Sequence, residues 1–111
     1  MGKAADNLQG TLDLLVLRIL ASAGERLHGY AIAERVHQLS DDVLRVEEGS
    51  LYPALHRMDE AGWIKSEWGL SDNKRRARYY MITKRGERHL QMLEDNWARH
   101  VRAVSRVLRH V

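Results

Sequence analysis

Apolar residues recur every three or four positions over most of the chain, which is the spacing of one face of an α-helix. The first such stretch follows residues 1–9, which we expect to be frayed. It runs from a Thr11 cap, with Asp13 in the first turn, to Gly24. Because its apolar residues cover more than one face, this helix should be buried by two partners. The apolar residues of this helix are Leu12, Leu14, Leu15, Val16, Leu17, Ile19 and Leu20.

A second helix is predicted to begin at Gly29 and Tyr30 and to be broken at residues 40–42, which read Ser-Asp-Asp. The side chains predicted to point inward are Ile32, Ala33, Val36 and Leu39. Residues 43–46 follow, and they are rich in apolar β-formers but short. They are therefore a candidate minor strand.

A third helix is predicted over residues 50–61, because characteristic residues mark both of its ends. Ser50 can cap the N-terminus, and Pro53 then falls in the first turn, where its missing N–H costs nothing. Gly62 is suited to the left-handed position just past the C-terminus. The apolar residues of one face, predicted to lie in the core, are Leu51, Leu55 and Met58.

The side chains left exposed on this third helix are Tyr52, His56 and Arg57. A phenol, an imidazole and a guanidinium lie near the positive end of the helix dipole, and no acidic residue follows until Asp59. This combination suits a phosphate-lined DNA groove. Ordinary polar decoration of a surface helix is the alternative.

The period changes beyond Gly62, where residues 63–68 and 77–82 are rich in aromatic and branched residues, as strands are. Residues 69–76 between them contain turn formers and are too many for a tight turn. We therefore expect a hairpin with a projecting, mobile loop. The basic side chains at its tip, candidates for DNA phosphates, are Lys74, Arg75, Arg76 and Arg78.

A last helix is predicted from a Thr83 cap to the end of the chain. It would be about 40 Å long, more than the small domain before it can cover. Its apolar seam requires a second copy of the chain, so we expect a homodimer. The seam residues are Leu90, Leu93, Trp97, Val101, Val104, Leu108 and Val111. A separate outer stripe, which we expect to be solvated, contains Arg99, Arg102, Arg106 and Arg109.

Composition narrows the class of protein. The 111 residues fit one domain, and a formal net charge of +3 is compatible with nucleic acid as a partner. Cysteine is absent, which excludes disulfides and cysteine-based metal sites. No apolar run approaches the roughly 18 residues of a membrane span, and no signal peptide is recognisable. We therefore expect a soluble cytoplasmic protein.

Motifs for metal binding and catalysis are weak. Glu-x-x-His occurs at residues 25–28 and 34–37, but a di-iron site needs this motif on two separate helices with two further glutamates. The first copy falls in a predicted loop. Gly49-Ser50 lacks the frame of a nucleophile elbow, and no glycine-rich phosphate loop occurs. We expect no metal, no cofactor and no enzymatic activity.

These elements predict a mainly α fold with a small β-hairpin, a winged helix-turn-helix followed by a long C-terminal dimerisation helix. Residues 1–82 would form the DNA-binding domain and residues 83–111 the dimerisation helix. Several motifs in this order resemble the PadR-type transcriptional regulators, in the short form with a single terminal helix. The resembling segments are residues 10–17, 28–32, 48–57, 75–80 and 82–86.

The resemblance implies a homodimeric DNA-binding regulator, usually a repressor that a small molecule releases from its operator. By position, Ser50, Tyr52 and Pro53 match the DNA-contacting helix, and Tyr30 matches a residue that approaches the DNA backbone. Lys74, Arg75 and Arg76 match the wing. Trp97 matches an aromatic residue with which some short members hold flat ligands. Glu94 stands one turn earlier, where an apolar residue would suit such a pocket better.

The predicted function is sequence-specific binding of a near-palindromic operator by two protomers, with half-sites about 34–36 Å apart or a multiple. Two other classes remain open. One is a metabolite-binding dimer whose DNA role is secondary, and the other is a winged helix used only for protein interactions. The operator, the effector and the sign of regulation are not encoded in recognisable form.

Overall fold

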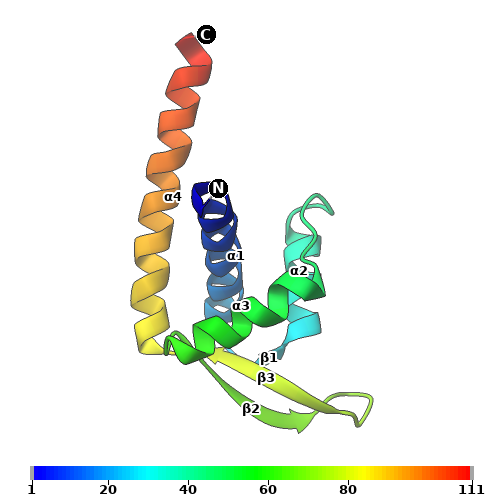
Figure 1. Ribbon diagram of the computed structural model, residues 1–111. Coiled ribbons are helices and arrows are strands. Elements are labelled where there is room, and N and C mark those ends of the chain that lie inside the picture. The colour runs from blue at the N-terminus through cyan, green and yellow to red at the C-terminus, as the bar shows by residue number, and fades with distance from the viewer. Residues whose placement is uncertain (1, 111) are drawn as a thin grey trace.

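The structure, a computed structural model, describes residues 2–110, with side chains from Gly10 onward. Over these residues the chain is mainly helical with one antiparallel sheet, and the predicted winged helix with a long terminal helix is confirmed (Figure 1). In chain order the elements are α1 (Gly2–Ala23), β1 (Leu27–His28), α2 (Gly29–Leu39), α3 (Glu48–Glu60), β2 (Ile64–Leu70), β3 (Arg76–Ile82) and α4 (Lys84–His110).

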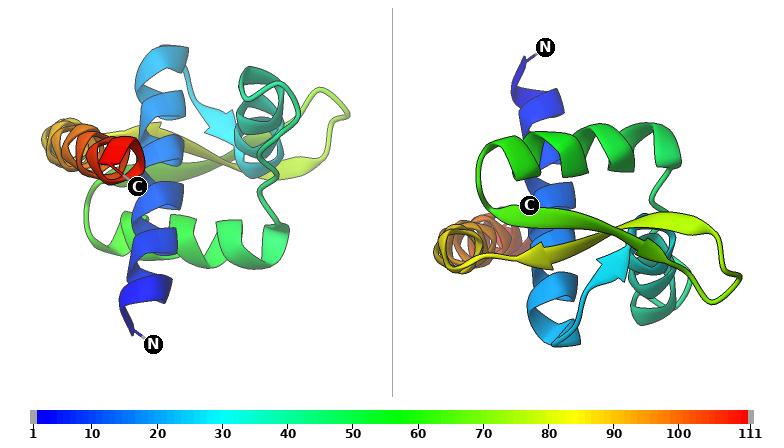
Figure 2. Two further views of the ribbon diagram at one scale, coloured as in Figure 1. Left: turned by 90° about the horizontal axis from the view of Figure 1, so that it is seen from above. Right: turned by 90° about the horizontal axis from the view of Figure 1, so that it is seen from below.

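The helix α1 is the centre of the arrangement. It contacts α2, α3, α4 and β3, so the prediction that more than one partner buries it is confirmed. Figure 2 shows α1 lying beside α4, with α3 and the sheet crossing it. The hairpin of β2 and β3 projects to one side, whereas α4 extends past the rest of the fold (Figure 1).

The core is built from the residues that share a face in each predicted helix. The side chains of Leu17, Ile32, Leu51, Leu55 and Met58 are essentially inaccessible to solvent. Burying such side chains contributes about 1.5–3 kcal/mol each relative to exposure. Leu39 was wrongly predicted to point inward: it is the last residue of α2 and is 77% exposed, whereas Val36 one turn earlier is buried.

The sheet has the strand order β1-β3-β2. Pairing of β2 with β3 runs from Ile64↔Ile82 to Leu70↔Arg76, close to the predicted hairpin. The predicted strand at residues 43–46 does not form, and those residues follow two positive-φ residues, Asp41 and Asp42. The other edge of β3 is instead occupied by β1, a strand of two residues that has too few positions to show an alternating pattern.

Two predicted helix starts are corrected. The helix α1 already begins at Gly2, so Thr11 lies inside it and is not a cap. The N-cap of α3 is Glu47, so Ser50 lies in the first turn and Pro53 in the second. Pro53 therefore has no N–H to offer the carbonyl of Gly49. Glu47 itself makes no side-chain capping hydrogen bond.

Three other predicted helix ends are confirmed. Gly24 and Gly62 adopt positive φ values of 67° and 81° just after α1 and α3. Thr83 caps α4, because its Oγ1 accepts a hydrogen bond of 3.0 Å from the backbone N–H of Gly86. The same hydroxyl donates to the carbonyl of Gly62 at 2.6 Å. Thr83 thus joins the start of α4 to the end of α3.

The apolar seam of α4 is only partly covered. Leu90 is buried and Leu93 packs on the core, whereas the later seam residues lie above the domain and face solvent. Those exposed residues are Trp97, Val101, Val104 and Leu108, with Val107 beside them. Val111 lies outside the described residues. Within the described part of the chain, no helix is both long and apolar enough to cross a membrane.

Candidate nucleic-acid interface

The outer face of α3 presents Ser50, Tyr52, Pro53 and His56 to solvent, and of these Tyr52 and His56 were predicted to be exposed. His56 forms an exposed pair with Glu60 one turn later, at 3.2 Å between Nε2 and Oε1. Exposed pairs of this kind contribute little and are easily exchanged. These four side chains can therefore reach a partner without disturbing the core.

Arg57 differs from the prediction, which placed it on this exposed face. Its NH1 and NH2 groups donate to the two carboxylate oxygens of Asp13 at 2.9 and 2.7 Å. Asp13 lies on α1 and is only 5% exposed. The hydrogen bond with Asp13 raises the pKa of Arg57 above its ordinary value, against the effect of burial. Arg57 therefore fastens α3 to α1, and this bidentate pair occupies its guanidinium.

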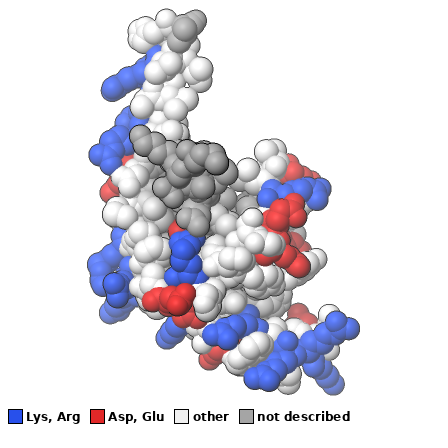
Figure 3. Space-filling view, in the orientation of Figure 1, with Lys and Arg blue, Asp and Glu red and all other residues white. Residues whose placement is uncertain are grey.

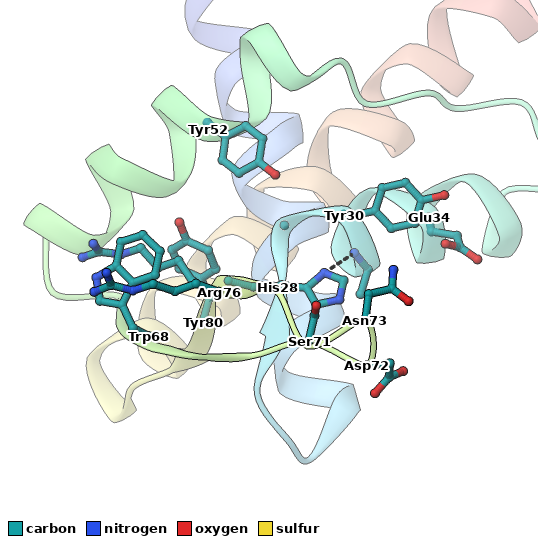
Figure 4. Close-up of a pocket in the computed structure, with 14 residues that line it drawn as sticks. His28, Tyr30, Glu34, Tyr52, Trp68, Ser71, Asp72, Asn73, Arg76 and Tyr80 are labelled. Atoms are coloured by element: carbon teal, nitrogen blue, oxygen red, sulfur yellow. Dashed lines mark hydrogen bonds between the residues drawn. The ribbon is translucent and has the colours of Figure 1, made fainter.

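Tyr52 lies against the beginning of α2. A Cβ atom added to Gly29 would stand 2.8 Å from Cε1 and 2.9 Å from the hydroxyl oxygen of Tyr52. Only glycine lets the ring approach the backbone this closely without displacement. The ring is still 44% exposed, and its neighbour Tyr30 is 66% exposed. The two phenols stand on adjacent helices beside the same hollow (Figure 4).

His28 organises the start of α2. Its Nδ1 accepts a hydrogen bond of 3.1 Å from the backbone N–H of Ala31, which makes it the N-cap of the helix. The ring also meets Tyr79 edge to face, with centroids 5.5 Å apart. Because Nδ1 accepts, the hydrogen of a neutral ring is on Nε2. The cap thereby sets the position of Tyr30 next to α3.

The wing consists of β2, β3 and the loop of residues 71–75. The strands reach to Leu70 and Arg76, so the loop is shorter than predicted. Hydrogen bonds close it internally: the backbone N–H of Ser71 donates to the carbonyl of Arg75 at 2.8 Å, and that of Lys74 donates to the carbonyl of Ser71 at 2.8 Å. The hairpin projects as predicted (Figure 1).

The wing cations fall into two groups. Lys74, Arg75 and Arg76 are exposed, and none of them takes part in an ion pair formed by the described residues. Arg78 is held instead: its Nε donates to Ser66 Oγ at 2.9 Å, and its NH2 lies 3.6 Å from Asp59. Arg78 thus joins the wing to the end of α3.

Figure 3 shows where charge gathers on one face of the molecule. Lysine and arginine side chains cover the projecting wing and follow the outer side of α4, whereas acidic side chains gather beside α2. The positive wing next to the exposed α3 face is the arrangement expected of a surface for a polyanion.

The two Glu-x-x-His motifs are engaged in other contacts. Glu25 lies 3.9 Å from Arg35, and His28 caps α2. Glu34 accepts a hydrogen bond from Gln38, and His37 lies 3.5 Å from Asp42. No group of three or more potential metal ligands occurs among residues 2–110.

The surroundings of Trp97 are now defined. Glu94 forms an ion pair with Arg18 of α1, so its carboxylate has a partner in the same chain. A hollow of about 320 Å³ lies between the middle of α1 and α4, and its lining includes Leu14, Leu93, Trp97 and His100. The tryptophan and histidine rings lie 5.8 Å apart and tilted.

Two residues of this region were not recognised in the sequence. Asp13 was taken as a first-turn charge, although an acidic residue within a run of leucines is itself a sign of a buried partner. Trp68 was taken as an ordinary strand residue, but its indole is 54% exposed and contacts wing arginines. No sequence signal identifies that contact, because it depends on the strand register.

Known proteins with the same fold and sequence pattern identify the family. A transcriptional regulator from Clostridium thermocellum is 27% identical with a TM-score of 0.80, over 91% of this chain and 96% of that chain. A PadR family transcriptional regulator from Eggerthella lenta is 31% identical with a TM-score of 0.73, over 96% and 90%. A Lysinibacillus sphaericus protein described as uncharacterized protein X is 28% identical over 94 residues, 85% of this chain and 84% of that protein.

The Transcriptional regulator PadR-like family matches residues 16–92, which is well over half of the chain. The match covers the helices and strands that carry the surface described above, from α1 to the covered part of α4. The family is one of transcriptional regulators, which implies a DNA-binding regulator. This chain therefore belongs to the PadR-like family of transcriptional regulators.

Proposed function

We propose that this protein is a homodimeric, sequence-specific repressor that binds a near-palindromic operator and is released by a small-molecule effector. The observation that carries the DNA part is the position of Tyr52 and Arg76 on one hollow, so that the α3 face and the wing are adjacent. A duplex presents its major groove and its phosphates side by side, which is what these two surfaces would meet.

The α3 helix is the element proposed to enter the major groove. Tyr52 and His56, with Ser50 and Pro53 beside them, are the side chains free to approach base edges or phosphates. Arg57 is not assigned to base reading, because Asp13 holds its guanidinium. Tyr30 lies where α2 would approach the sugar–phosphate backbone.

The wing is proposed to supply affinity through phosphate contacts. Lys74, Arg75 and Arg76 are exposed and without ion-pair partners in the described part of the chain. Neutralising a phosphate releases a counterion, so each contact should make binding more salt-dependent. Arg78 contributes chiefly by fixing the wing against α3.

The long helix α4 is proposed to form the dimer, with residues 1–82 acting as the DNA-binding domain and residues 83–111 as the dimerisation helix. Trp97, Val101, Val104 and Leu108 are exposed on one seam. Covering them with a second copy would gain about 25 cal/mol per Å² of apolar surface. Two-fold pairing would set the α3 helices about one DNA turn apart, roughly 34–36 Å or a multiple.

The effector site is proposed at Trp97. A hollow of about 320 Å³ lies beside it, and Glu94, the residue that argued against an apolar pocket, is paired with Arg18. Two indoles related by the dimer axis would stack on a planar aromatic ligand. Titrating flat aromatic compounds and following both tryptophan emission and DNA release tests this part; compounds that change neither exclude it.

A titration of labelled duplex DNA at several salt concentrations tests the main proposal. We expect two protomers per bound duplex, preference for a symmetric site, and an affinity that falls steeply as salt rises. Transcription from a promoter containing that site should fall when the protein is added. Binding that is insensitive to salt and to sequence would contradict the proposal, and salt-insensitive ligand binding alone would favour a metabolite-binding dimer.

A further inference from the structure

An open hollow of about 850 Å³ separates the inner face of the wing from α2 and α3 (Figure 4). Its lining combines the exposed rings of Tyr30, Tyr52 and Trp68 with the buried ring of Tyr80. Two arginines, Arg76 and Arg78, complete this part of the lining. Two carboxylates also border it, Glu34 on α2 and Asp72 on the wing loop. Both arginines come from the wing, whereas α2 contributes a carboxylate, so the two walls differ in charge.

Trp68 and the two arginines are brought together by the strand register. Trp68 is paired with Arg78 and Leu70 with Arg76, so both arginines project from the same face of the hairpin as the indole. The Arg76 guanidinium carbon lies 4.4 Å from the Trp68 ring centroid, and that of Arg78 lies 5.4 Å from it. These distances are those of cation–π stacking, for which tryptophan is the preferred ring.

The stack is not part of the hydrophobic core. Trp68 is 54% exposed, whereas Ile64 and Tyr80, which lie on the same face nearer the base of the hairpin, are buried. Arg78 is anchored by Ser66 and Asp59, and Ser66 Oγ donates to Asp59 Oδ2 at 2.7 Å. Arg76 has no ion-pair partner among the described residues, so its guanidinium faces solvent on one side and the indole on the other.

We propose that this hollow seats one sugar–phosphate strand of the duplex and that Trp68 is a DNA-positioning residue of the wing. The inference rests on the proposed function. If α3 occupies a major groove and the wing the neighbouring minor groove, the single strand dividing the two grooves must cross the space between them. Trp68 holds Arg76 toward a phosphate of that strand, and its exposed edge packs on a deoxyribose.

This role explains an otherwise unfavourable arrangement. A large indole left half exposed gives up much of the stabilisation that burial would supply. Stacking restricts the long, flexible Arg76 side chain before binding, so less conformational entropy is lost when it meets a phosphate. Glu34 and Asp72 repel a phosphate from the rim, which leaves the Arg76 side of the hollow as the favoured path.

A salt-dependence cycle tests the proposal with Trp68→Leu, Arg76→Ala and the double variant. If Arg76 neutralises a phosphate only while stacked, each single variant should lower the slope of log K against log salt by about one. The double variant should then lose about one in total, not two. Trp68→Phe, which retains a flat ring, should keep most of the slope.

Two controls separate this role from a general loss of folding. Trp68→Leu should unfold at nearly the wild-type temperature because the side chain is half exposed. Met81→Ala alters the opposite face of the same hairpin and should leave the slope unchanged. Wild-type tryptophan emission should change when DNA binds, and Trp68→Leu should lose most of that change although Trp63 and Trp97 remain.

The outcomes distinguish the two levels of inference. A wild-type protein without salt-dependent DNA binding would overturn the proposed function and the stack together. Normal wild-type binding, combined with an unchanged slope in Trp68→Leu or with additive losses in the double variant, would overturn only the role of Trp68. A shared loss in all three variants, with Trp68→Phe close to wild type, supports it.

Discussion

Arg57 of α3 and Asp13 of α1 face each other as a bidentate pair, with hydrogen bonds of 2.9 and 2.7 Å. Asp13 is almost completely buried, and the Arg57 guanidinium bonds both of its carboxylate oxygens. The pair fixes the position of α3 against α1, and α1 also packs against α4. The helix proposed to enter DNA and the helix proposed to form the dimer are therefore held by one element.

Replacing Arg57 with leucine should lower the free energy of unfolding by about 2–3 kcal/mol, because it leaves a buried carboxylate unpaired. Chemical denaturation with its midpoint and slope measures this. His56→Ala is the matched control, because it changes the exposed residue directly before Arg57. It should leave stability nearly intact while weakening DNA binding. Equal stability of Arg57→Leu and wild type would show that the pair contributes nothing.

Replacing Gly29 with alanine should displace Tyr52, since the new Cβ would stand 2.8 Å from the ring. We expect a loss of about 1–3 kcal/mol in stability from the crowding, together with weaker DNA binding. Gly49→Ala provides the comparison, because nothing lies within 4 Å of a Cβ at that site. Its stability should be unchanged or higher. If the two variants behave alike, the contact of Tyr52 with Gly29 is not restrictive.

Stability should fall in mildly acidic solution because of His89. The ring stacks on Trp63 with centroids 3.6 Å apart, and burial lowers the pKa of His89 below its ordinary value of 6.5, opposed by the charge of Asp13. The unfolded chain therefore takes up a proton at higher pH than the folded one. The stability that neutral His89 contributes is intact above about pH 6.5. It is lost as the pH falls through the lower pKa of the folded state.

Thermal unfolding between pH 7.5 and 5 measures this loss. His89→Gln removes the titrating ring, so its stability should change less over the same interval than that of the wild type. Buried and paired carboxylates titrate at lower pH and contribute to both proteins alike. Parallel curves for the two proteins would show that the Trp63–His89 stack does not sense pH.

Features that depend on neighbouring residues in the chain could be predicted from the sequence. Gly62 and Thr83 were placed correctly because a left-handed residue and a cap are requirements of the adjoining helix ends. The core residues Leu51, Leu55 and Met58 followed from helical spacing. The start of α3 was wrong because Ser50 is a good cap by type, yet the helix continues back to Glu48.

The candidate site was less predictable because its details depend on contacts between distant residues. Arginine is a residue type that often reads bases, so Arg57 was assigned that role. Only the packing of α1 on α3 brings Asp13 to it. The exposure of Leu39 and the strand β1 depend on where neighbouring elements end. The stack of Trp68 on Arg76 depends on the register of β2 and β3. The sequence did not show where the loop between these strands begins and ends, so it did not define the register.

A charge placed on the α4 seam should separate the protomers. Val104→Asp puts a carboxylate at a position expected to lie in the dimer interface, where burying it unpaired is costly. Sedimentation should show a monomer, and affinity for a two-half-site operator should fall because the half-sites no longer bind as one unit. Arg102→Asp changes the charge more, but on the outer stripe, and should remain a dimer. A dimeric Val104→Asp would place the interface elsewhere.

Selection of bound fragments from random duplex DNA tests the central claim most directly. A dimer that offers two α3 helices and two wings should recover a near-palindrome whose half-sites lie about 34–36 Å apart or a multiple of it. Tyr52→Ala should relax the recovered sequence, whereas Lys74→Ala should weaken binding to every sequence alike. Recovery of no enriched sequence, or of a single half-site without symmetry, would contradict binding as a symmetric homodimer.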